Sequence, residues 1–500
     1  MSRPTALARA VVITIPAGLA ALLVAVRWSN APLWRDEFAT SMYASLSPGR
    51  LLEATSHVDG VLAPYYLLVH ALAPLAGLGE GMRWASAFGF VATSALVGIL
   101  GQRWFGTVSG LFAGSAFAIG AAGIASGANA RPYALSILAV AVAILALDTT
   151  RTARSPAAGW IVYSAAGVVA VILQPLAALP LALTVILSVS APRARNAAIW
   201  AAVSIPWFVA TLLMILRGLG QRGQLDWLSR VDARDAVQTL AAALSLSPGR
   251  AVAFDAVVLA VFLAVGLLTL VRGTRSWRRP LLFALALAVA PTALLFAMSV
   301  TIRPLLAERY VLWSSIGAAL VIGAAVGRLA VEHRLWDVVG ACAAIVLLIV
   351  GGARGAESAL YPLRGDDFPA IASDIRSSAQ PGDLLVVVQR YEQGGVAYGF
   401  AEASGDRGYR REILQTVPDG PLPVLGVRRI ESVDPLRTSP VASKDATDPS
   451  RTMWIVSIWP PTLEDRSGLD PAIAACVSHA TPSTGRLIHG SWLFRVPCPG

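Results

Sequence analysis

The sequence predicts an all-α polytopic membrane protein of about 11 transmembrane helices, followed by a small extracytoplasmic α/β domain. Of the 500 residues, 56% are hydrophobic and only 14% are charged, whereas a soluble domain carries about a quarter charged residues. Apolar runs of about 20 residues, the length that crosses a bilayer, recur along residues 1–353. Residues 354–500 are polar and rich in turn residues. This composition excludes a soluble globular enzyme and a disordered chain.

The positive charge of the chain is concentrated in its apolar half. Residues 1–353 contain 25 Arg and 13 acidic residues, whereas residues 354–500 contain 15 basic and 17 acidic residues. The formal net charge of +10 therefore comes from loops between membrane helices, where it orients the protein in the bilayer. We expect the lipid bilayer, and no nucleic acid, as a partner.

The distribution of arginine among the loops indicates which apolar segments cross the membrane. The apolar segment 64–78 is only about 15 residues long, so we expect an interfacial or re-entrant helix there. With that segment left out and the N-terminus cytoplasmic, the short Arg-rich loops fall on the cytoplasmic side. The first span resembles a signal peptide, but its length favours an uncleaved helix. The predicted spans are 8–27, 82–100, 107–125, 132–148, 158–173, 176–191, 197–216, 251–271, 280–300, 309–327 and 335–352.

The tail beyond residue 353 reads as a separate α/β domain on the extracytoplasmic side. An amphipathic helix is predicted over 368–376, and buried-type strands over 384–388, 453–459 and 491–496. Residues 433–451 are predicted to be a loose loop.

The three cysteines do not form a metal-binding set. On an oxidising side of the membrane, Cys476 and Cys498 either form a disulfide or remain as free thiols, and the sequence leaves both possibilities open. Cys342 lies inside an apolar run, and we expect it to be a small packing residue.

The first outer loop, residues 28–81, carries an unusual concentration of polar side chains. Asp36 and Glu37 follow the first span directly, and His57 and Asp59 come later in the same loop. The two adjacent carboxylates either cap a short interfacial helix or do chemistry there. In the second case one of them accepts a proton from an attacking hydroxyl, or holds a divalent metal.

Two further outer turns carry arginine and tyrosine. Arg131 and Tyr133 lie where one span ends and the next begins, and Arg303, Arg309 and Tyr310 lie in a later turn. Each arginine is either an interfacial anchor or a ligand of a phosphate, which the guanidinium fork fits well. All of these turns fall on the same side of the membrane in the predicted topology.

Four short motifs in this order resemble the GT-C superfamily of membrane glycosyltransferases. More narrowly, they are similar to family-39-like, protein-mannosyltransferase-related enzymes of the actinobacterial type. The resemblance covers roughly residues 1–330. The motifs are Trp34-Arg35-Asp36-Glu37, His57-Val58-Asp59 followed by Tyr65-Tyr66, Ala130-Arg131-Pro132-Tyr133, and Glu308-Arg309-Tyr310.

The resemblance implies a glycosyltransferase that uses a polyprenyl-phosphate sugar on the extracytoplasmic face. It assigns the catalytic carboxylate to Asp36, with Glu37 beside it, and juxtamembrane helices to residues 37–46 and 64–77. It assigns binding of the donor phosphate to Arg131, Arg303, Arg309 and Tyr310. It assigns contacts with the substrate or within the loop to His57, Asp59, Tyr65, Tyr66 and Tyr133.

One position departs from the family pattern. Relatives place an acidic residue two positions before the arginine of the second turn, and this sequence has Asn129 there. Asp36 and Asn129 are the candidate ligands of a divalent cation, Mg²⁺ or Mn²⁺. Because an amide is a neutral and weaker oxygen ligand, dependence on such a metal stays open.

Three functions remain open from the sequence. The first is transfer of a sugar, with mannose as a candidate, from a polyprenyl-phosphate donor to an exported glycan, lipid or protein acceptor. The second is a transporter or flippase of a lipid-linked substrate, which requires ionisable residues in the middle of its spans. The third is a catalytically degenerate scaffold, which Asn129 favours.

Overall fold

The structure is a computed structural model, and its contacts divide the chain into two compact units. The helical unit comprises Met1–Asn30, Leu52–Tyr65 and Arg83–Pro362, and the sheet unit comprises Ala31–Leu51, Tyr66–Met82 and Leu363–Gly500. Each unit is described by itself. The structure describes residues 5–31, 33–150, 155–188, 194–221, 228, 230–246, 252–331, 334–361, 368–387, 426–433, 436–440, 452–457, 477–478, 480–481, 485–488 and 491–497.

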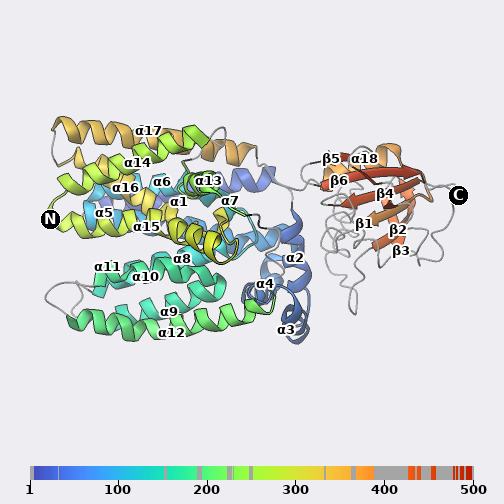
Figure 1. Cartoon of the computed structure of the whole chain (residues 1–500), viewed down its shortest axis with the longest axis horizontal. Coiled ribbons are helices and arrows are strands. Elements are labelled where there is room, and N and C mark those ends of the chain that lie inside the picture. The colour runs from blue at the N-terminus through green and yellow to red at the C-terminus, as the bar shows by residue number, and fades with distance from the viewer. Residues whose placement is uncertain are drawn as a thin grey trace. The chain divides into compact units, whose positions relative to one another are not determined.

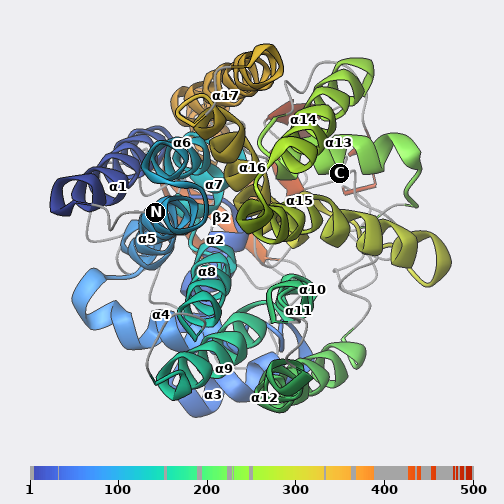
Figure 2. The same ribbon diagram turned by 90° about the vertical axis from the view of Figure 1, so that its left-hand side faces the viewer.

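The helical unit is a bundle of long apolar helices that run side by side (Figure 1). Figure 2 views the bundle along its helices, with α1, α5 and α6 forming one group and α9 and α12 another. Its elements are α1 (Ala6–Asn30), α5 (Arg83–Phe105), α6 (Thr107–Ala118), α7 (Ala121–Gly127), α8 (Tyr133–Thr150), α9 (Ala157–Leu173), η2 (Pro175–Ala177), α10 (Ala178–Leu183), α11 (Val185–Ser188), α12 (Ala194–Leu219), α13 (Ala233–Ala243), α14 (Val252–Arg272), α15 (Arg275–Thr301), η4 (Glu308–Tyr310), α16 (Ser314–Arg328) and α17 (Leu335–Leu360).

Each of the eleven predicted spans contains helix, and the chain is a multi-pass membrane protein. Among the described residues, 7 helices are long and apolar enough to cross a membrane, and the pair α6 and α7, bent by 62°, makes an eighth. The bend falls at Ile119 and Gly120, between the two helices. The remaining predicted spans correspond to shorter apolar helices, α9, Pro175–Ser188 and α16.

Close approach of helices in the bundle depends on small residues. A methyl group on Gly317 of α16 would collide with the carbonyl oxygen of Ala284 on α15, and one on Gly323 with that of Ser109 on α6. Backbones can approach this closely only where side chains are absent. Cys342 is free and exposed on α17, so the prediction of a packing role for it is wrong: its face of the helix lies on the outside of the helical unit.

Hydrogen bonds define two ends of the bundle. At one end, Gln102 of α5 donates to the carbonyl of Ala8 in α1 over 3.3 Å. At the other end, which we call the loop end, Arg83 of α5 donates to the carbonyl of Trp28 in α1 over 3.5 Å. Ser86 of α5 also donates to the carbonyl of Arg131 there, over 2.9 Å. The turns before α5 and before α8 therefore meet at the loop end.

The predicted first outer loop folds into short helices. They are α2 (Arg35–Ala44), α3 (Pro48–His57), α4 (Ala63–Ala76) and η1 (Gly79–Met82). The helices predicted over 37–46 and 64–77 correspond to α2 and α4. The segment left out of the spans is α4, which has only 14 residues and is too short to span a bilayer.

The C-terminal part of the sheet unit contains a six-stranded mixed sheet and, among its described residues, the helix α18, as predicted for an α/β domain. The strand order is β3-β2-β1-β4-β6-β5, in which β1 pairs parallel with β4 and the other pairs are antiparallel. The prediction of a loose loop over 433–451 is wrong in part, because β3 lies within it and pairs with β2. The elements are α18 (Phe368–Ser378), β1 (Leu384–Val387), β2 (Gly426–Val433), β3 (Leu436–Pro440), β4 (Thr452–Ser457), β5 (Gly485–Ile488) and β6 (Ser491–Pro497).

The sheet has two apolar faces, because successive side chains of a strand point to opposite sides. Leu385 of β1 and Trp454 of β4 lie on the face that α18 covers. Leu384 of β1 and Phe494 of β6 belong to the core of the other face. Cys476 and Cys498 lie outside the described residues, so their pairing stays a prediction.

Candidate functional site

Arg131 is held at the loop end of the helical unit by its backbone. Its amide donates to the carbonyl of Asn129 over 2.8 Å, and its own carbonyl accepts from the Ser86 hydroxyl. The residue as a whole is only 7% exposed. Pro132 follows it and begins the turn into α8, in the position where proline is best tolerated by a helix.

Arg309 and Tyr310 come from the 3-10 turn η4, between α15 and α16. The guanidinium carbon of Arg309 lies 5.6 Å from the centroid of the Tyr310 ring, within the range of a cation–π interaction. The Tyr310 ring packs against an apolar cluster that contains Leu295 of α15 and Ala243 of α13. The turn is therefore anchored on two helices.

The structure brings the two distant turns together around the Tyr310 phenol. Burial raises the pKa of Tyr310 above its usual value of 10.0, and the neighbouring Tyr133 raises it further. Arg309 and Arg131 act in the opposite direction and lower the pKa of the same phenol. We call Arg131, Tyr133, Arg309 and Tyr310, whose side chains all act on the pKa of this one phenol, the arginine–tyrosine cluster.

Two other groups of the same turn lie close in sequence to this cluster. Arg303 is half-buried, and its amide donates to the carbonyl of Met298 at the end of α15 over 3.2 Å. Glu308 is exposed, and partial desolvation by the protein atoms around its carboxyl raises the pKa of that group. The sequence assigned no role to Glu308.

Sequence reasoning also gave no role to a set of buried polar groups beside Arg131. Arg83 and Ser86, at the start of α5, are both fully buried. The phenol of Tyr65 lies 3.4 Å from the Ser86 hydroxyl, which in turn bonds to the Arg131 carbonyl. The sequence feature that could have indicated this set is Arg83, an arginine at the first residue of an apolar span. A charge at that depth is costly, so it often marks a functional position.

In the sheet unit, Asp36 and Glu37 occupy different environments on the first turn of α2. Glu37 is fully buried, and its carboxylate accepts the backbone N–H of Trp34, just before the helix, over 3.4 Å. Asp36 is half-buried. The capping alternative considered from the sequence therefore describes Glu37, whereas Asp36 stays the candidate base.

The two predicted tyrosines of α4 are buried. Tyr66 is fully buried and stacks on Tyr43 of α2, with ring centroids 4.9 Å apart, and Tyr65 is 1% exposed. The expectation that they contact substrate stays a prediction. His70 of α4 bonds through Nδ1 to the carbonyl of Ala44 over 2.8 Å, so α2 and α4 are fastened to each other.

His57 and Asp59 lie at the turn between α3 and α4. Asp59 adopts a positive φ of 59°, a conformation that Asp tolerates better than most residues, and its carbonyl accepts the N–H of Leu62. Asp59 thus shapes the turn. The side chain of His57 lies outside the described part of the chain.

The described residues do not supply a metal-binding cluster. Within the part of the chain that the structure describes, no three His, Cys, Asp or Glu residues are grouped closely enough to hold an ion. Asn129 offers a neutral amide oxygen, and its position is half-buried. A divalent cation held by Asp36 and Asn129 therefore stays a prediction, with one carboxylate and one neutral amide as its candidate ligands.

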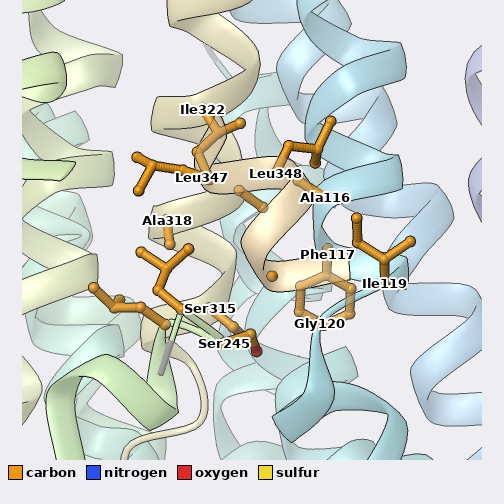
Figure 3. Close-up of a pocket in the computed structure, with 14 residues that line it drawn as sticks. Ala116, Phe117, Ile119, Gly120, Ser245, Ser315, Ala318, Ile322, Leu347 and Leu348 are labelled. Carbon is orange, nitrogen blue, oxygen red and sulfur yellow. The ribbon is translucent and has the colours of Figure 1, made fainter. Parts of the chain in front are cut away.

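A small cavity lies in the helical unit between the bend of α6 and α7 and the helices α16 and α17 (Figure 3). Its volume of about 20 Å³ accommodates a single water. It is lined mainly by apolar side chains such as Phe117 and Leu347, together with Ser245 and Ser315. It is too small for a sugar, and none of the residues that line it belongs to the arginine–tyrosine cluster.

Comparison with known proteins finds similarity in structure only. No protein-family model and no curated protein matches the chain. ArnT from Cupriavidus metallidurans bound to undecaprenyl phosphate is similar with a TM-score of 0.46 at 11% identity, covering 97% of each chain. The oligosaccharyltransferase of Archaeoglobus fulgidus is similar with a TM-score of 0.46 at 14% identity, over 82% of this chain and 60% of that one. The arabinofuranosyltransferase AftD from Mycobacteria has a TM-score of 0.43 at 16% identity, over 75% of this chain and 30% of that one.

Proposed function

We propose that the protein is a membrane glycosyltransferase that transfers a sugar from a polyprenyl-phosphate donor to an exported acceptor. The observation that carries this proposal is the arginine–tyrosine cluster, in which Arg131 and Arg309 act on one phenol. Two guanidinium groups at the end of a membrane bundle suit a phosphate on a lipid, because the isoprenoid tail stays in the bilayer and the phosphate at its surface.

The reaction follows as a single displacement with inversion. The hydroxyl oxygen of the acceptor attacks the anomeric carbon of the sugar, and its proton passes to the carboxylate of Asp36. The bond between the anomeric carbon and the phosphate oxygen breaks, and polyprenyl phosphate leaves. Arg131 and Arg309 stabilise the negative charge that grows on the leaving phosphate, and the Tyr310 hydroxyl serves as an additional donor.

No step of this reaction is routed through a metal ion. Two arginines supply the positive charge that a divalent cation supplies in other phosphate chemistry. We therefore expect transfer to continue after chelation of divalent cations by EDTA. A loss of more than about tenfold, restored by Mg²⁺ or Mn²⁺, would contradict this expectation.

The alternative of a transporter finds no support in the buried charges of the described spans. Such proteins place ionisable residues near the middle of the membrane. Here Arg103 pairs with Asp148 over 2.6 Å, and Arg328 pairs with Asp337 over 3.1 Å. Both pairs lie near helix ends and fasten neighbouring helices to each other.

The test is transfer from radiolabelled polyprenyl-phosphate sugars in proteoliposomes, with mannose as the first sugar and other hexoses and pentoses in parallel. Asp36→Asn should reduce transfer by about 10²–10⁴-fold. Arg354→Ala is the matched control, because Arg354 pairs with Glu357 on α17 and does not belong to the arginine–tyrosine cluster. Equal transfer by Asp36→Asn and wild type would reject the assigned base, and no transfer of any sugar by the wild type would reject the function.

A further inference from the structure

We infer that the C-terminal α/β domain positions the helix that carries Asp36, through contact between Phe38 of α2 and Phe368 of α18. The inference rests on the proposed function, because it gives this domain a part in the same transfer reaction. It makes Phe38 and Phe368 positioning residues that act through α2 and contact neither the sugar nor the phosphate.

One apolar core contains both α2 and the C-terminal domain. Leu33, before α2, and Phe38 belong to the same buried cluster as Phe368. The rings of Phe38 and Phe368 meet edge to face, with centroids 5.5 Å apart and planes at 76°. The other members of the cluster are Ile371, Ala372, Ile375 and Ala379 of α18 and its end, and Leu385, Trp454, Val456 and Leu493 of the sheet.

The helix α2 depends on such packing for its stability. It has only 10 residues, and isolated helices shorter than about 12–15 residues are marginal in water. Phe38 is 4% exposed and Phe368 is fully buried. An edge-to-face aromatic pair stabilises a contact beyond the effect of the area that it buries. The order of α2 therefore depends on a domain that lies more than three hundred residues later in the sequence.

The helical period separates Phe38 from Asp36 on the surface of α2. Each residue of an α-helix advances by about 100° around the axis, so side chains two positions apart point about 200° apart. When Phe38 is buried in the domain core, Asp36 is turned away from that core. Glu37, between them, is buried and holds the start of the helix. The domain thus fixes the rotation of α2 and with it the direction of the Asp36 carboxylate.

A variant on the opposite face of the same sheet provides a control for the contact with α2. Phe494 of β6 is fully buried in the core on the opposite side of the sheet, where no residue of α2 belongs. It stacks on Trp492 at 5.7 Å. Phe494→Ala therefore disturbs the same domain by a similar loss of buried surface and leaves the contact with α2 in place.

The experiment compares Phe38→Ala, Phe368→Ala, the double variant and Phe494→Ala as full-length proteins in proteoliposomes. We expect kcat for sugar transfer to fall about 10–100-fold in the first three, since small displacements of a catalytic group have effects of that size. The KM for the donor should stay within about twofold, and the double variant should be no worse than the single ones, because both remove one contact. Phe38→Leu should recover most of kcat.

Hydrogen exchange gives a readout that does not depend on activity. Amides of α2 should exchange faster in Phe368→Ala than in wild type, and at the wild-type rate in Phe494→Ala. Unchanged exchange of α2 in Phe368→Ala would overturn the inference, and so would faster exchange with undiminished kcat. If wild type transfers no sugar, the proposed function fails, whereas the exchange data still decide whether the C-terminal domain holds α2.

Discussion

The side chain of Gln221, just after α12, binds the backbone of the turn that contains Gly60. Its oxygen accepts the N–H of Gly60 over 2.7 Å. Its nitrogen donates to the carbonyls of Thr55 and Ser56, each over 2.9 Å. One glutamine therefore satisfies three backbone groups, and it fastens the α3–α4 turn to a membrane helix.

Gln221→Ala should lower the stability of the protein. It leaves three backbone groups without their partner, and each lost bond of this kind costs about 0.5–1.5 kcal/mol. Gly60→Ala should have a smaller effect in the same direction, because its Cβ would lie 2.8 Å from Nε of Arg217, a side chain that can move, and 3.0 Å from the carbonyl oxygen of Thr55. Thermal unfolding in detergent micelles measures both. Ser377→Ala, an exposed serine with only local bonds, is the control, and an unchanged Tm for Gln221→Ala would contradict the anchoring role.

Arg131→Lys and Arg309→Lys should each raise the KM for the polyprenyl-phosphate donor by about tenfold, which corresponds to about 1.4 kcal/mol. Lysine keeps the charge but loses the planar fork that binds two phosphate oxygens at once. The matched control is Arg354→Lys, at a local ion pair outside the cluster. Donor titration in proteoliposomes measures the effect, and unchanged KM values in both variants would argue against phosphate binding at these arginines.

How much of this arrangement the sequence predicts depends on the range of the interactions. The spans, α2, α4 and three strands follow from local patterns, because hydrophobic length and alternation are properties of short segments. Strand β3 was missed, since Leu436-Arg-Thr-Ser-Pro440 has little apolar character and is held by its pairing with β2. The packing of Phe38 against Phe368 and the burial of Tyr66 on Tyr43 were missed because they depend on tertiary contacts that no local pattern records.

Glu308→Gln should stabilise the protein at neutral pH and have little effect in acid. Desolvation raises the pKa of the Glu308 carboxyl above its ordinary value of 4.5, so the folded state favours the neutral form. The stability that this group contributes is present below its unfolded pKa and is lost as the pH rises through the folded pKa. Glutamine stays neutral throughout. The difference in Tm between variant and wild type should therefore grow as the pH rises above the ordinary pKa of 4.5, and a constant difference would contradict it.

Asp337→Asn should destabilise the helical unit strongly. Arg328 and Asp337 are 2% and 4% exposed, and Nη2 of Arg328 lies 3.1 Å from Oδ1 of Asp337. Removing one partner of a buried pair leaves an uncompensated charge and costs about 3–5 kcal/mol. The double variant Arg328→Met/Asp337→Leu removes both charges and should be closer to wild type. Thermal unfolding measures the ranking, and equal loss in the single and double variants would show that the pair is not the cause.

Substitutions of the two carboxylates at the start of α2 should have different effects, one on stability and the other on the transfer rate. Glu37→Gln weakens the bond to the Trp34 amide, and loss of such a capping contact costs about 0.5–2 kcal/mol of stability. It keeps Asp36, so the transfer rate below the unfolding temperature should stay within a few fold. Asp36→Asn removes the proton acceptor, so the rate should collapse while Tm changes little. Measuring Tm and kcat on both variants tests the division of roles. A variant Glu37→Gln that is stable but inactive would transfer the catalytic assignment to Glu37.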